Sequence, residues 1–257
     1  MGPLIGHDGR NLPGSRRTTV AHSVIALLHG VAPGNEDGVL GHLTAAFARC
    51  GHDIGTHSFT GGPRPRISLD GVRMLVVMGS RDSSTDRSLP WLDDESRFVA
   101  AAIARGVPVM GICFGAQLLA GLTGGRVLPG AAMERGMVDV SSEQVDRVPA
   151  GPWYAHHRDE IVPPPEADVI ATSAASVQAF GYGPHLGVQF HPEATEATLD
   201  VWRTSFSATA GAPTDDDAEW EADRRALQEH RIALAARTGT LVRGFVRSAQ
   251  RHLADVG

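Results

Sequence analysis

Short runs of consecutive apolar residues alternate along this chain with longer stretches in which apolar side chains recur every three or four positions. Consecutive apolar residues are typical of strands that are buried on both faces of a sheet. In the first half of the chain they predict strands at Val24–Leu28, Met74–Met78 and Val107–Gly111. The third predicted strand leads straight into Cys113, and a helix is expected over residues 116–122.

Helical spacing occurs between these runs, and glycines mark the expected helix ends. One helix carries Leu40, Leu43 and Phe47 and stops at Gly51. A second helix is expected to be capped by Asp93 or Asp94. Its apolar side and its end are predicted at Phe98, Val99, Ala102, Ile103 and Gly106. Buried strands separated by helices predict an α/β fold, a doubly wound and mainly parallel sheet flanked by helices.

The pattern changes after residue 126, where turns separate shorter apolar segments and extra β structure is expected. Strands are predicted at Met137–Val145, Asp168–Thr172, Ser176–Phe180 and Gly187–Phe190. A helical tail follows over residues 218–253, with an apolar face expected at Leu227, Ile232, Leu234 and Leu241. We therefore expect a loose N-terminal extension (1–19), one domain (20–210) and a helical C-terminal extension packed on it (211–257).

Charge and composition narrow the classes of function. The formal charge is −6, so no basic surface for nucleic acid is expected. All 23 basic residues are arginine, which excludes Schiff-base chemistry and a phosphate loop of the Walker type, because both need a lysine. No cofactor is predicted. Only two cysteines occur, and neither a signal peptide nor a membrane-spanning run is recognisable, so a cytoplasmic protein is expected.

The segment Gly111-Ile-Cys-Phe-Gly115-Ala-Gln117 carries the clearest chemical signal. A strand that delivers a cysteine onto a tight turn, with a helix behind it, is the geometry of a nucleophile elbow. The start of a helix lowers the pKa of a thiol and raises the thiolate fraction at neutral pH. The alternative for such a segment is a buried cysteine that only fills the core.

A second segment, Gly187-Val-Gln-Phe-His191-Pro-Glu193, places a histidine at the end of an apolar strand. A thiol nucleophile needs a base to take and return a proton, and the base needs a partner that fixes its tautomer. Because proline stiffens the turn, Glu193 is expected to reach back to the imidazole. Taken alone, this tripeptide also fits an ordinary turn after a strand.

Together the two segments resemble the class I, triad-type glutamine amidotransferases, over residues from about 22 to 205. Supporting pieces occur in the expected order at Val77–Ser80, Pro90–Leu92, Tyr154–Asp159 and Gln178–Phe180. Within that family the chain is most similar to free-standing domains that resemble the amidotransferase half of GMP synthase.

The resemblance implies a role for each matching residue. Cys113 would attack the side-chain amide of L-glutamine, with His191 as the base and Glu193 as its carboxylate partner. The N–H groups of Phe114 and of the Gly79–Ser80 turn would hold the oxyanion. The amino-acid end of the substrate would contact Gln117 and the backbone near His156 and His157. Many relatives have a second glycine at the position of Ser80, and serine restricts φ there.

Other polar and aromatic residues carry weaker signals. His156, His157 and Asp159 could be taken for metal ligands, but no matching set at zinc spacing occurs, so no metal is predicted. Cys50 is expected in the core. His29 is interpreted as an ordinary polar residue at a strand end, although it could lie at the mouth of the site. Trp153 and Tyr154 are expected to be packing residues.

Three functions remain open on the sequence alone. The first is a glutaminase that supplies ammonia to an acceptor on a synthetase partner, because no acceptor or ATP site is visible in this chain. The second is a hydrolase of larger γ-glutamyl conjugates that uses the same three residues. The third is a non-catalytic regulatory subunit, which is disfavoured because nucleophile, base and carboxylate are all present.

Overall fold

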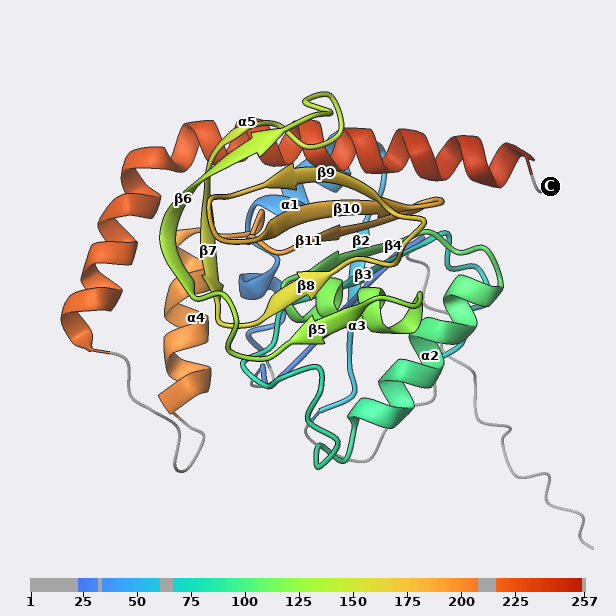
Figure 1. The fold of residues 1–257 in the computed structure, drawn as a ribbon, viewed down its shortest axis with the longest axis horizontal. Helices are drawn as coiled ribbons and strands as arrows, with labels where there is room; N and C mark the ends of the chain where they lie inside the picture. Colours follow the sequence, from blue (N-terminus) through green and yellow to red (C-terminus); the bar gives the residue numbers. More distant parts are fainter. Residues whose placement is uncertain (1–22, 32–33, 61–66, 208–215, 256–257) are drawn as a thin grey trace, which may run out of the picture.

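A computed structural model describes residues 23–31, 34–60, 67–207 and 216–255, and the predicted N-terminal extension lies outside these ranges. Within them, nine strands form one sheet (Figure 1). Its order is β2 (Ile54–Ser58), β1 (Val24–Leu28), β3 (Met74–Val77), β4 (Val109–Ile112), β11 (His185–Val188), β10 (Val177–Tyr182), β9 (Asp168–Thr172), β6 (Glu134–Ser142) and β7 (Gly151–His157). A separate antiparallel pair joins β5 (Arg126–Leu128) to β8 (Glu160–Val162).

The first five strands of that order run parallel, and the remaining four pair antiparallel. Helices cover both faces of the parallel part, so the predicted α/β class with extra β structure is confirmed. The helical elements are η1 (Asp37–Val39), α1 (His42–Arg49), α2 (Leu92–Ala104), α3 (Phe114–Leu122), α4 (Glu196–Ser207) and α5 (Asp217–Asp255). Of the helices described, none combines the length and apolar character needed to cross a membrane.

Alternation along the central strands divides the interior into two cores. In β1, Val24, Ala26 and Leu28 pack with α1 and α5, whereas Ile25 and Leu27 face α2 and α3. Successive residues of a strand point to opposite faces, so a strand with every residue buried serves both layers. The consecutive apolar runs of the sequence have this physical origin.

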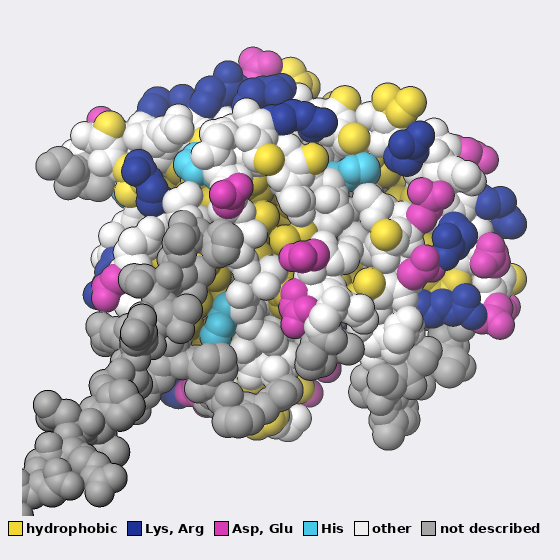
Figure 2. All heavy atoms as spheres, turned by 180° about the vertical axis from the view of Figure 1, so that it is seen from behind, with side chains coloured by type: hydrophobic (Ala, Val, Ile, Leu, Met, Phe, Trp, Pro, Cys, Tyr) yellow, Lys and Arg dark blue, Asp and Glu magenta, His cyan; other side chains and the backbone are white. Residues whose placement is uncertain are grey.

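The C-terminal helix α5 runs along the upper edge of the molecule in Figure 1. Its buried side includes Leu227, Leu234 and Leu241, as predicted, but Ile232 is 77 % exposed, so its predicted place on the packed face is wrong. The four positions do not share one stripe, because Ile232 is two residues from Leu234 and points away from it. Seen from behind, arginine side chains form a row over this helix (Figure 2), which gives it a solvated outer face.

The structure corrects several other boundaries. The predicted cap at Asp93 or Asp94 is wrong, since α2 begins at Leu92 and both aspartates lie inside its first turn. There their negative charges interact favourably with the positive end of the helix dipole, but they do not cap the helix. The strands predicted at Met137–Val145 and Gly187–Phe190 begin two or three residues earlier, as β6 and β11. Strand β7 covers a segment for which no strand was predicted, and the prediction also missed β2, β5 and β8.

Two glycines let α3 approach β3 and β4 closely. A side-chain carbon on Gly115 would lie far inside contact distance of the Val77 carbonyl oxygen, and one on Gly111 would overlap the Gly115 carbonyl. Both obstacles are backbone atoms, which cannot swing aside as a flexible side chain would. The bend between β4 and α3 therefore requires glycine on each side of Cys113.

This packing predicts that Gly115→Ala lowers the free energy of unfolding by about 3 kcal/mol or more, because the new methyl group overpacks a rigid site. Gly121 lies in the same helix with nothing within 4 Å of its added carbon, and serves as the matched control. Gly121→Ala should be neutral or gain up to about 1 kcal/mol from better helix propensity. Urea unfolding of the two variants checks this, and equal midpoints would contradict it.

Candidate active site

Cys113 occupies a strained bend between β4 and α3. Its φ and ψ are 50° and −108°, and it alone has a positive φ among the described residues other than glycine. Such a conformation costs about 1–3 kcal/mol and persists only where the surroundings enforce it. Here the N–H of Cys113 donates to the Val188 carbonyl at 2.8 Å, and its own carbonyl accepts from the N–H of Gln117 at 3.0 Å. The predicted elbow is present in the structure.

His191 and Glu193 lie on the turn that follows β11, the strand beside β4. The Nδ1 atom of His191 is 2.8 Å from Oε1 of Glu193, and both side chains are buried. The Cys113 side chain lies close enough to the same imidazole to raise the pKa of His191, and both side chains lie beside Gly79. The structure thus brings the three residues proposed for catalysis into one chain of contacts.

The backbone of the His191–Glu193 turn is held from three directions. The His191 N–H donates to the Tyr154 carbonyl at 2.8 Å, and the Glu193 carbonyl accepts from the His42 N–H at 3.2 Å. From α5, the buried hydroxyl of Thr238 donates to the Pro192 carbonyl at 2.7 Å. Because β7, α1 and α5 are all hydrogen-bonded to this turn, the imidazole is held in its position.

Burial and charge act in opposite directions on the pKa of His191. Burial lowers it, but the negative charge of Glu193, the charge of Cys113 and hydrogen bonds to both raise it to about 10. At neutral pH the imidazolium is therefore the favoured form of His191, beside the side chain of Cys113. This is the pairing that keeps a cysteine reactive.

The residues expected to bind the oxyanion meet at the same place. Gly79 follows β3, and a side-chain carbon on it would lie 2.9 Å from Cε1 of His191 and 3.7 Å from Cβ of Cys113. Only glycine leaves room for the base at this position. Ser80 needs no positive φ, and its hydroxyl accepts from the Asp82 N–H at 3.1 Å. Phe114 is the first residue of α3, so its N–H has no acceptor within the helix.

The residues expected to contact the substrate also line the cavity, which has a volume of about 270 Å³. Gln117 is buried, with its side chain 3.4 Å from both Ser84 and Gln189. His156 presents its carbonyl oxygen 3.9 Å from Sγ of Cys113. His157 is bonded inward to Glu134 at 3.1 Å, and burial lowers its pKa, so a neutral ring is favoured.

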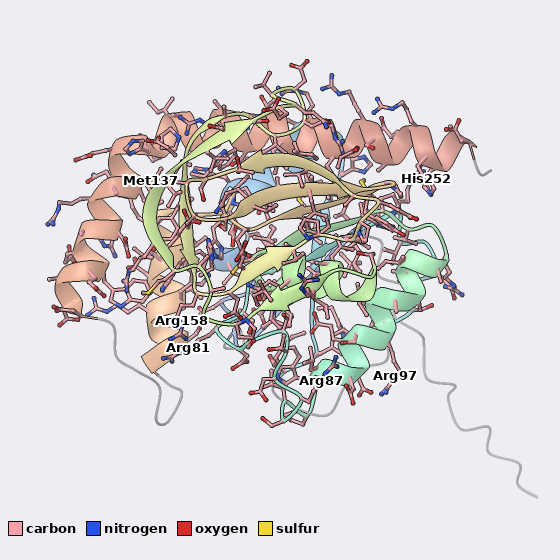
Figure 3. All side chains as sticks on the ribbon, viewed as in Figure 1. Arg81, Arg87, Arg97, Met137, Arg158 and His252 are labelled. Atoms are coloured by element: carbon pink, nitrogen blue, oxygen red, sulfur yellow. The ribbon has the colours of Figure 1, made fainter. Side chains whose placement is uncertain are left out.

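Several residues of the cavity were missed by the sequence prediction. Trp202 of α4 packs against His191 with ring centroids 4.8 Å apart. Arg135 of β6 binds Glu219 at 2.8 Å and Asp223 at 2.9 Å, which ties the start of α5 to the cavity wall. Arg81 and Arg158 come from two different loops to the same side of the molecule (Figure 3) and also line the cavity. Asp223 offered a usable signal, because it lies three residues after Trp220 and four before Leu227, on the buried side of α5.

No group of three or more histidine, cysteine, aspartate or glutamate side chains within the described part of the chain is arranged to hold a metal ion. His156, His157 and Asp159 do not converge on one point.

The raised pKa of His191 predicts a defined loss of stability on the alkaline side. A folded pKa of about 10 lies above the unfolded value of 6.5, so this group stabilises the fold fully below pH 6.5. That stabilisation is lost as the pH rises toward 10. In Glu193→Gln the raising charge is gone and burial remains, so the pKa of His191 should fall. Histidine NMR titration, with urea unfolding at several pH values, measures both effects.

Glu229→Gln is the matched control, because it removes the same charge from an exposed position on α5. It should leave the His191 titration and the alkaline loss of stability unchanged. An unaltered His191 pKa in Glu193→Gln would refute the assigned electrostatics.

Known proteins with similar sequences agree with this geometry. The chain is 41 % identical over 160 residues to a GMP synthase (glutamine-hydrolyzing) subunit of Ignicoccus hospitalis, covering 59 % of this chain and 81 % of that protein. It is 36 % identical over 112 residues to the corresponding subunit of Sulfurisphaera tokodaii, covering 39 % and 60 %. Against GMP synthase of Thermomicrobium roseum it is 35 % identical over 113 residues, 41 % of this chain and only 21 % of that longer protein.

Solved structures show the same fold. A glutamine amidotransferase from Thermotoga maritima superposes with a TM-score of 0.72 at 22 % identity, over 87 % of this chain and 97 % of that one. A glutamine amidotransferase from Methylobacillus flagellatus gives 0.70 at 21 % identity, over 88 % and 93 %. The sequence profile of class-I glutamine amidotransferases matches residues 36–202. The chain therefore belongs to the class-I glutamine amidotransferase family.

Proposed function

We propose that this protein hydrolyses the side-chain amide of L-glutamine through a thioester on Cys113 and supplies the ammonia to a synthetase partner. The observation that carries the proposal is the grouping of Cys113, His191 and Glu193 in the wall of a cavity of about 270 Å³. That volume is at the small end of the range for ligand pockets and suits a substrate of amino-acid size.

Each step uses a group already in place. The Cys113 thiolate attacks the amide carbon, and the oxyanion is held by N–H groups at Phe114 and the Gly79–Ser80 turn. His191 gives its proton to the leaving ammonia, which leaves a γ-glutamyl thioester. His191 then takes a proton from water, and hydroxide attack on the thioester carbon releases glutamate and restores the thiolate. Glu193 stabilises the imidazolium through both halves of the cycle.

Purified protein is expected to release glutamate from L-glutamine, and Cys113→Ala should abolish this release. Glu193→Gln should lower kcat by about two to four orders of magnitude, because the base loses its orienting carboxylate. Cys50→Ala is the matched control: it removes the only other cysteine, which lies half-buried outside the cavity, and should keep wild-type turnover. An electrophilic glutamine analogue should label Cys113 and spare Cys50.

Turnover of bulky γ-glutamyl conjugates, without glutamate release from L-glutamine, would contradict the proposal and support the conjugate hydrolase. Catalysis that persists in Cys113→Ala would contradict the nucleophile itself.

A synthetase partner is proposed because the relatives from Ignicoccus and Sulfurisphaera are each named as one subunit of a GMP synthase. Size-exclusion chromatography with the synthetase encoded nearest to this gene should show a joint peak, strengthened by glutamine and nucleotide. No complex under any ligand condition would argue against a dedicated partner.

A further inference from the structure

His29 and Glu95 form a second buried acid–histidine pair beside the first. His29 follows β1 and Gly79 follows β3, and the parallel register that sets Leu27 opposite Val77 brings them together at one sheet edge. The Nδ1 atom of His29 is 3.0 Å from the Gly79 carbonyl oxygen, and its Nε2 atom is 2.8 and 2.9 Å from the two oxygens of Glu95. Glu95 is completely buried.

The partners determine where the protons of this ring lie. A carbonyl oxygen only accepts hydrogen bonds, so Nδ1 carries a proton. Burial lowers the pKa of His29, but the charge of Glu95, the bonds to Glu95 and Gly79 and the charge of Asp82 together raise it. Both ring nitrogens face acceptor oxygens, and the raised pKa favours the form of His29 that donates from each.

The bond to Gly79 acts on a peptide group that faces the active site. The Gly79 carbonyl and the Ser80 N–H belong to one trans peptide plane and point in opposite directions. A donor on the carbonyl therefore fixes the direction of the N–H as well. It also polarises the peptide, which strengthens the N–H as a donor.

The same ring touches the other oxyanion residue. Its centroid lies 4.7 Å from that of Phe114 and 5.1 Å from that of Trp91. His29 thus packs against one contributor of an N–H group and is hydrogen-bonded to the other.

We propose that His29, held by Glu95, is a positioning residue that fixes and polarises the Gly79–Ser80 peptide as one side of the oxyanion hole. This inference rests on the proposed attack of Cys113 on an amide, and it explains why a buried charged pair lies where no reacting atom touches it.

Three variants in a Cys50→Ala background separate the donor from the fold. His29→Phe/Glu95→Leu keeps a ring against Phe114 and Trp91 but removes the donor and its carboxylate together. His29→Asn/Glu95→Leu differs only in offering an amide N–H near the position of Nδ1. Glu95→Gln keeps His29 as a neutral donor to Gly79, with the Gln amide bound to Nε2.

Loss of the donor should lower kcat about 10- to 1000-fold with KM within about threefold, because the oxyanion exists only in the transition state. The asparagine variant should recover part of that loss, and Glu95→Gln should retain most of the activity. Alkylation of Cys113 by iodoacetamide forms no oxyanion, so its rate should stay near that of the wild type. In NMR spectra, the Ser80 amide proton should move upfield when the donor is absent.

Unchanged kcat and an unchanged Ser80 resonance in folded His29→Phe/Glu95→Leu would overturn the proposal. Equal losses in all three variants, with alkylation slowed in parallel, would also overturn it, because they indicate a merely structural pair. If His29→Phe/Glu95→Leu does not fold, the two remaining variants are compared instead. Full activity in both, or full loss of activity in both, would then overturn the proposal. A wild-type protein that hydrolyses no γ-glutamyl amide refutes the proposed function, and the Ser80 resonance then decides the positioning role alone.

Discussion

The backbone bend at Cys113 is the constraint on which the rest of the site depends. A residue with a φ of 50° that is not glycine stays in place only because β4 and α3 are packed too closely to relax. That closeness is provided by Gly111 and Gly115, and the neighbouring strand β11 accepts the Cys113 N–H through Val188. Since β11 also delivers His191, the same strand that holds the bend places the base.

Around this bend, three histidines each face a carboxylate, and the three pairs differ in the direction in which the histidine pKa is shifted. His191 with Glu193 and His29 with Glu95 have raised pKa values, whereas the pKa of His157, beside Glu134, is lowered by burial. Positive charge is thereby concentrated on the side where a thiolate and an oxyanion would lie. On the side where the substrate would lie, the neutral form of the His157 ring is favoured.

Much of this arrangement was predictable because central strands of a parallel sheet are buried on both faces and leave consecutive apolar runs. Val24–Leu28 was placed without error for this reason. Asp168–Thr172 was also placed without error, although β9 belongs to the antiparallel part and three of its five residues are exposed. Strand β7 was not, because Pro152 and the polar His156 and His157 hide its pattern. Of the site, the contacts among Cys113, His191 and Glu193 followed from local motifs.

Contacts between distant segments were invisible to that reasoning. Glu95 is 66 residues from His29, and Asp223 is 88 residues from Arg135. A usable signal nevertheless existed: Glu95 lies on the buried stripe of α2 with Leu92, Val99 and Ala102. A charge in an apolar stripe must find a partner, because burying it alone is too costly. Local spacing shows that the partner must exist, whereas the sheet register determines which residue it is.

The hydroxyl of Thr238 on the Pro192 carbonyl has a consequence for how this protein could have been assembled in evolution. The family profile ends at residue 202, whereas Thr238 and the whole of α5 lie beyond it. A recombination event that moved only the profile segment into another gene would leave a buried carbonyl without its donor and uncover the apolar side of α1, including Leu43 and Phe47, which packs on α5. The family segment and its C-terminal helix therefore depend on each other physically, and gene shuffling is expected to carry the two as one piece.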